Sequence, residues 1–139
     1  MKIFFLFAIF LLLLAGLNCK KNSKPNQLPD ASLDIKVLTQ NLTFPWDLVW
    51  GADNMLWMTE RGGKVSRVDP SSGSVTLVTT INDVKATGEG GLLGIVLHPN
   101  FNTNPQVFVA YNYDKSGTYS EKIVRYTYNG TTLVNPVIL

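Results

Sequence analysis

Hydrophobic and polar positions alternate in short runs through most of the chain after residue 33. No window there keeps apolar residues at the 3.6-residue spacing of an amphipathic helix. The runs are rich in Val, Ile, Thr, Tyr and Trp and end at Gly, Pro, Asn or Asp, which is typical of strands joined by turns. The pattern predicts an all-β fold, with strands at Lys36–Thr39, Asp47–Trp50, Met55–Thr59, Lys64–Asp69, Ser74–Thr80, Leu92–Leu97, Val107–Asn112, Lys122–Tyr128 and Thr132–Ile138.

One strand motif occurs twice. The pattern Lys-apolar-x-Arg-apolar from Lys64 to Val68 recurs 58 residues later, from Lys122 to Tyr126. Each copy follows two apolar strands and precedes a turn and a further strand. This predicts two units of four antiparallel strands, with the extra length in loops at Ile81–Gly91 and Asp114–Glu121. Four-stranded repeats are typical of β-propeller blades, and a two-sheet sandwich is the alternative. Because two blades cannot close a ring, we expect the chain to be the start of a longer propeller.

A different pattern opens the chain. Lys2 is followed by an apolar run from Ile3 to Leu14 and by the small residues Ala15 and Gly16, the order found in secretory signal peptides. The run ends before Cys19, so it is shorter than the roughly 20 apolar residues that span a bilayer. We expect residues 1–19 to be a cleaved signal peptide rather than a retained anchor.

The only cysteine stands at the end of this leader. Leu17-Asn18-Cys19 resembles a relaxed bacterial lipobox, in which the cysteine thiol is acylated. Ordinary cleavage nearby, with Cys19 as a leftover thiol, is the alternative. A single cysteine has no disulfide partner in its own chain, which favours lipid attachment. We therefore expect an exported lipoprotein, periplasmic or at the cell surface, anchored to the membrane.

Composition divides the rest of the chain and excludes one class of partner. Residues 20–33 are polar and contain proline, which predicts a flexible tether. Residues 34–139 are left for the folded part. The formal net charge is only +2, with no basic cluster beyond the tether, so nucleic acid is not an expected partner.

Several motifs follow one another through the folded part. They are Asn41-Leu42-x-x-Pro45-Trp46, Asp53-Asn54-x-Leu56-Trp57-x-Thr59-Glu60-Arg61, Gly63-Lys64-Val65-x-Arg67-Val68, Gly88-Glu89-Gly90-Gly91-Leu92-Leu93-Gly94, His98-Pro99-Asn100-Phe101 and Lys122-Ile123-Val124-Arg125-Tyr126. In this order they resemble the PQQ-dependent glucose/sorbosone dehydrogenases, also called soluble aldose sugar dehydrogenases. The resemblance covers nearly all of Val37–Leu139, and the Gly-rich block running into His-Pro-Asn-Phe is its most specific part.

The resemblance implies a six-bladed propeller that binds pyrroloquinoline quinone (PQQ) and calcium at the mouth of its central channel. It implies oxidation of the anomeric carbon of an aldose sugar to a lactone, with electrons passed to an acceptor. In such an enzyme calcium polarises the quinone, and a basic side chain removes the sugar hydroxyl proton as hydride leaves.

The resemblance carries two substrate-binding candidates onto this chain. Glu89 matches a family position, often glutamine, that lies beside the substrate, but a carboxylate accepts hydrogen bonds and cannot donate them as an amide does. In the alternative interpretation, the backbone N–H groups of Gly90 and Gly91 satisfy Glu89 within its own turn. Trp46 matches the start of the first blade, where it lines the channel or packs in the core.

The catalytic machinery implied by the resemblance is missing from these residues. The family's catalytic histidine stands in a later His-Gly-Gly-like block that this chain does not contain, and its quinone-binding arginines and calcium ligands also come later. His98 stands in a His-Pro turn, where we expect packing or hydrogen bonding rather than proton transfer. The sequence thus predicts a fragment with no catalytic residue and no metal ligand of its own, inactive by itself. The alternative function is a non-catalytic surface lipoprotein whose propeller binds a protein or glycan.

Overall fold

The structure, a computed structural model, describes residues 32–139. The predicted leader, Cys19 and most of the predicted tether lie outside the described residues. All eight strands and the core fall in one compact unit, Lys36–Leu139. Within the described residues, no helix is long and apolar enough to cross a membrane.

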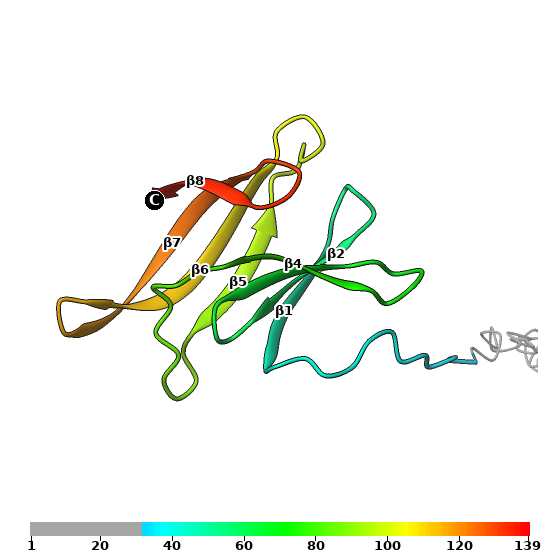
Figure 1. The fold of residues 1–139 in the computed structure, drawn as a ribbon, viewed down its shortest axis with the longest axis horizontal. Helices are drawn as coiled ribbons and strands as arrows, with labels where there is room; N and C mark the ends of the chain where they lie inside the picture. The colour runs from blue at the N-terminus through cyan, green and yellow to red at the C-terminus, as the bar shows by residue number, and fades with distance from the viewer. Residues whose placement is uncertain (1–31) are drawn as a thin grey trace, which may run out of the picture. The chain divides into compact units, whose positions relative to one another are not determined.

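The strands form two antiparallel four-stranded sheets, each in sequence order, as the repeat predicts (Figure 1). The first sheet contains β1 (Pro45–Trp50), β2 (Leu56–Glu60), β3 (Lys64–Val68) and β4 (Val75–Thr80). The second contains β5 (Leu92–Leu97), β6 (Gln106–Lys115), β7 (Thr118–Tyr128) and β8 (Leu133–Ile138). Tight turns join neighbouring strands, and several use positive φ, for example at Asn54 (59°), Gly63 (110°) and Gly130 (97°).

The predicted strand Lys36–Thr39 is wrong, because this segment has no secondary structure. Its apolar residues alternate as in a strand, but Val37 is 66% exposed and no described strand pairs with it. A strand needs a hydrogen-bonded neighbour, and here alternation occurs without one.

The predicted loop Asp114–Glu121 is mostly strand. β6 and β7 continue to the pair Lys115–Thr118, closed by Ser116 (φ 52°) and Gly117 (φ 86°). Positive φ at both central residues is typical of a tight hairpin turn whose twist matches that of the strands. The result is a long hairpin that extends beyond the other strands in Figure 1.

The core lies between the two sheets. Trp57 is fully buried, and its ring packs edge-on against Phe101 (5.5 Å between centroids) and Tyr128 (5.0 Å). Arg67 lies over the rings of Trp57 and Tyr128, pairs with Asp53 at 2.8 Å, and donates a hydrogen bond to the Tyr128 hydroxyl at 2.8 Å. Aromatic and charged contacts therefore join the sheets at the edge where β2 begins.

The polar side chains of Asp47 in β1 and Thr59 in β2 also join the two sheets. The Asp47 carboxylate accepts the Ile95 N–H at 2.9 Å. The buried Thr59 hydroxyl donates to the Leu93 carbonyl at 2.8 Å and accepts the Asp47 N–H at 3.1 Å. These bonds fix β5 against β1 and β2 and thereby place the loop that precedes β5.

Candidate functional site

The candidate residues lie at one edge, here called the loop edge. It consists of the start of β1, the end of β2, the loop Asn82–Gly91, and the turn of the β6–β7 hairpin. Antiparallel pairing brings the start of β1 to the end of β2, and the isolated bridge Val84–Tyr113 brings the loop to β6. Fold topology thus gathers segments that are far apart in sequence.

Arg61 connects the parts of this edge. Its backbone N–H donates to the Phe44 carbonyl at 3.0 Å, and its own carbonyl accepts the Leu92 N–H at 2.9 Å. Its guanidinium donates to the Gly88 carbonyl and lies 4.9 Å from the centre of the Phe44 ring. Arg61 was not predicted as a site residue, although it closes the Thr59-Glu60-Arg61 motif at a strand end.

The Gly-rich segment is held by Asn112, which is 4% exposed. Its side-chain oxygen accepts the Gly91 N–H at 3.0 Å, and its backbone N–H donates to the Gly91 carbonyl at 3.0 Å. The Asn112 amide nitrogen donates to Glu121 at 3.1 Å, and the Tyr119 hydroxyl donates to the Thr87 carbonyl at 3.3 Å. The β6–β7 hairpin therefore fixes the backbone on both sides of Glu89.

Glu89 itself is exposed at the tip of this loop. The Gly90 N–H donates to the Thr87 carbonyl at 3.0 Å, and the Gly91 N–H donates to Asn112. The interpretation in which these two groups satisfy Glu89 is therefore wrong. A fixed backbone carries a carboxylate that remains open to a ligand.

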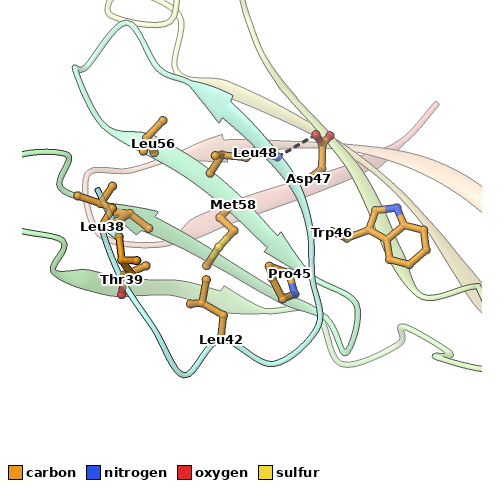
Figure 2. A pocket seen from close by; sticks show the side chains of 11 residues that line it. Leu38, Thr39, Leu42, Pro45, Trp46, Asp47, Leu48, Leu56 and Met58 are labelled. Atoms are coloured by element: carbon orange, nitrogen blue, oxygen red, sulfur yellow. Dashed lines mark hydrogen bonds between the residues drawn. The ribbon is translucent and has the colours of Figure 1, made fainter. Parts of the chain in front are cut away.

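Trp46 is 46% exposed and is not a core residue of the described structure. Figure 2 shows its indole pointing away from Leu48 and Met58, although Trp46 is one of the residues that line the same cavity as they do. The segments that carry Trp46 and Glu89 meet through Arg61 at the loop edge. Both side chains are exposed in the described structure, and the Glu89 carboxylate can accept hydrogen bonds.

Asp83 of this loop forms an ion pair with Lys122 of β7, which the sequence did not predict. The Lys122 ammonium is 2.6 Å from Asp83 and lies over the rings of Tyr111 and Tyr113, while the Tyr111 hydroxyl donates to Asp83 at 3.1 Å. Burial raises the pKa of the Asp83 carboxyl, but the hydrogen bonds from Lys122 and Tyr111 outweigh it and leave the pKa below its ordinary value. Burial raises the pKa of the Tyr111 phenol above its ordinary value.

The described residues do not by themselves fit the cofactors that the resemblance implies. Among residues 32–139 no three His, Cys, Asp or Glu side chains gather as metal ligands would. PQQ carries carboxylates, but Arg61 is engaged by Gly88 and Phe44, and Lys122 is engaged by Asp83. His98 is tied into its own turn, where Nδ1 accepts the Asn100 N–H at 3.0 Å.

Comparison with known proteins gives a consistent match. The family profile described as Glucose / Sorbosone dehydrogenase matches residues 42–137. Quinoprotein glucose dehydrogenase B of Acinetobacter calcoaceticus is 40% identical over 83% of this chain and 27% of its own length.

The solved structures that share the fold include two aldose sugar dehydrogenases. The PQQ-bound form of aldose sugar dehydrogenase from Streptomyces coelicolor is 27% identical with a TM-score of 0.68, over 75% of this chain and 32% of that one. The apo-form of the soluble aldose sugar dehydrogenase from Escherichia coli is 25% identical with a TM-score of 0.66, over 74% and 31%. The chain spans about a quarter of the length of the curated relatives it matches.

Proposed function

The chain belongs to the glucose/sorbosone dehydrogenase family, and from that premise we propose that it forms part of an exported quinoprotein that oxidises aldoses to lactones. The sheets correspond to the first two four-stranded blades of the family's propeller, as predicted. The aldose sugar dehydrogenase from Streptomyces coelicolor is solved in a PQQ-bound form, and we extend PQQ to the longer protein as its redox cofactor, together with calcium.

The observation that carries the proposal is the geometry around Glu89. Asn112 and Tyr119 hold the loop from one side and Arg61 from the other, and the carboxylate stays exposed. In the proposed enzyme, Glu89 accepts a hydrogen bond from a sugar hydroxyl and Trp46 lines the approach to it. The chain thus contributes substrate contacts, while quinone, calcium and the catalytic base are held by other parts of the ring.

A chimaera tests this proposal. Residues 42–137 would replace the matching segment of the Acinetobacter relative, and aldose-dependent dye reduction would be measured with and without PQQ and calcium. We expect turnover that requires PQQ, and a larger effect of Glu89→Gln on KM than on kcat, because that change alters binding rather than chemistry. A chimaera that folds and binds PQQ but oxidises no aldose would favour the non-catalytic binding platform instead.

Export and lipid attachment are a separate part of the proposal. A leader ending at Cys19 would place the propeller outside the cytoplasm, where a sugar dehydrogenase meets its substrate and passes electrons to a membrane acceptor. We expect Cys19→Ser to move the protein from the membrane fraction to the soluble fraction of a bacterial host. A Cys19→Ser protein that stays membrane-bound would indicate an uncleaved helix instead.

A further inference from the structure

The segment that carries Glu89 has a sequence that by itself favours many conformations. Gly88 precedes Glu89, and Gly90 and Gly91 follow it. Glycine loses more backbone freedom on folding than any other residue, so a glycine-rich segment is costly to hold in one conformation. A single position for the Glu89 carboxylate therefore requires contacts from outside the segment.

The side chains that hold this segment differ in how well they are shielded from water. Arg61 and Tyr119 each donate one hydrogen bond to a carbonyl of the loop, and both bonds are exposed. Water competes for exposed hydrogen bonds, which makes their net contribution small. The bond from the Gly91 N–H to the Asn112 side chain is buried instead. Asn112 is therefore the contact that matters most for the position of the loop.

Asn112 also holds the loop at two separate points. Its backbone carbonyl accepts the Lys85 N–H at 2.8 Å. Its side-chain oxygen accepts the Gly91 N–H at 3.0 Å, and its backbone N–H donates to the Gly91 carbonyl at 3.0 Å. One residue of β6 thus closes the stretch from Lys85 to Gly91 at both ends, with Glu89 between them.

The partners of the Asn112 side chain require an amide at this position. The Gly91 N–H can only donate, so it faces the amide oxygen, and the amide nitrogen then donates to Glu121 at 3.1 Å. Glu121 is the residue that pairs with Asn112 across the β6–β7 hairpin (Figure 1). Alanine here would leave the Gly91 N–H without its buried partner, and aspartate would place a second carboxylate beside Glu121.

We propose, resting on the proposed function, that Asn112 is a positioning residue of the sugar site. It acts through the backbone of Lys85 and Gly91 and keeps the Glu89 carboxylate where a sugar hydroxyl meets it. When a binding-competent conformation is populated for only part of the time, the apparent affinity falls by that fraction. Loss of the Asn112 amide should therefore raise KM for the sugar and leave the chemical step nearly unchanged.

The chimaera of the proposed function carries the test. We expect Asn112→Ala to raise KM for the aldose roughly tenfold and to change kcat less than about twofold. Deuterium exchange of the peptide that spans residues 85–91 should become faster in this variant. Asn104→Ala is the matched control, because it removes the same amide from the turn at the other end of β5, where Asn104 bonds to His98. Its KM should match that of the parent.

A double-variant cycle separates positioning from a general loss of stability. If Asn112 acts through Glu89, the two residues are coupled and their effects on KM are not additive. Asn112→Ala should then leave KM unchanged in a Glu89→Ala background, because no carboxylate remains to be positioned. An equal rise in KM with and without Glu89 would overturn the proposal.

An exchange of the two hydrogen-bonding partners provides a rescue. Asn112→Asp should raise KM as Asn112→Ala does, and adding Glu121→Gln should bring it back to within about threefold of the parent, because the new amide donates to the new carboxylate. Two results would overturn the positioning role while the proposed function stands: an exchanged pair with no recovery of KM, or faster loop exchange in Asn112→Ala with KM unchanged. A parent chimaera that oxidises no aldose would overturn both.

Discussion

At the scale of single residues, the geometry of the candidate site depends on backbone contacts that only small side chains allow. A Cβ added to Gly91 would lie 2.3 Å from the Arg61 carbonyl oxygen, and the residue has a φ of 152°. The Arg61 carbonyl cannot move away without breaking a hydrogen bond, because it accepts the Leu92 N–H. The approach of β2 to β5, and with it the position of Glu89, requires glycine here.

Gly91→Ala should therefore destabilise the fold by about 1 to 3 kcal/mol, as overpacking against backbone does. Urea unfolding of residues 32–139 measures this free energy. The matched control is Gly62→Ala, where a Cβ meets no atom within 4 Å and φ is not positive, and its effect should stay within about 0.5 kcal/mol. Equal losses in both variants would contradict the close approach.

A second residue-scale expectation concerns Asp83. A carboxyl whose pKa is lowered in the folded state stabilises the fold above its ordinary pKa of 3.8, and this stabilisation is lost as pH falls below it. The free energy of unfolding of the parent should fall between about pH 5 and pH 3, and Asp83→Asn should flatten that part of the curve. The control is Asp34→Asn, which changes an exposed carboxyl that precedes the first strand. If Asp83→Asn leaves the pH dependence of the unfolding free energy unchanged, the Asp83–Lys122 pair is not the source of that dependence.

At the scale of elements, the sheets are joined by a few polar bridges set among apolar contacts. Thr59 is the central one, because its hydroxyl bonds both to Leu93 across the interface and to Asp47 within its own sheet. Thr59 is fully buried, so the loss of one bond leaves its partner without water as a substitute.

Thr59→Val keeps the shape of the side chain and removes the hydroxyl. It should lower the free energy of unfolding by about 1 to 3 kcal/mol, because the Leu93 carbonyl and the Asp47 N–H lose a buried partner. Thermal or urea unfolding checks this, with Thr76→Val, at an exposed position of β4, as the control. An effect no larger than that of the control would show that apolar packing alone joins the sheets.

The positions of the strands could largely be predicted from the sequence, but the residues that hold the candidate site together could not. Alternation and turn residues predicted all eight observed strands, and the Lys64/Lys122 repeat predicted the grouping into fours. The same alternation wrongly predicted a strand at Lys36–Thr39, since periodicity does not reveal whether a neighbouring strand is present. At the site, the resemblance pointed to Glu89 and Trp46, but Arg61 and Asn112 act through backbone contacts across 27 and 21 residues, which no local pattern encodes.

At the scale of the whole molecule, the described residues form two blades with the Glu89 loop at one edge, and a closed ring requires more blades than these two. The chain belongs to the glucose/sorbosone dehydrogenase family, its two sheets are consistent with the first blades of the family's propeller, and we propose that this propeller oxidises a sugar. The central claim of this account is that the Glu89 loop lines the place where the sugar binds.

Substrate protection in the chimaera tests that claim most directly. With its other cysteines removed and Glu89→Cys introduced, the rate of thiol labelling by a maleimide would be measured with PQQ and calcium bound, with and without saturating aldose. We expect aldose to slow labelling at position 89 and to leave Thr131→Cys, in the distant β7–β8 turn, unaffected. Equal labelling rates at position 89 with and without sugar would contradict the account.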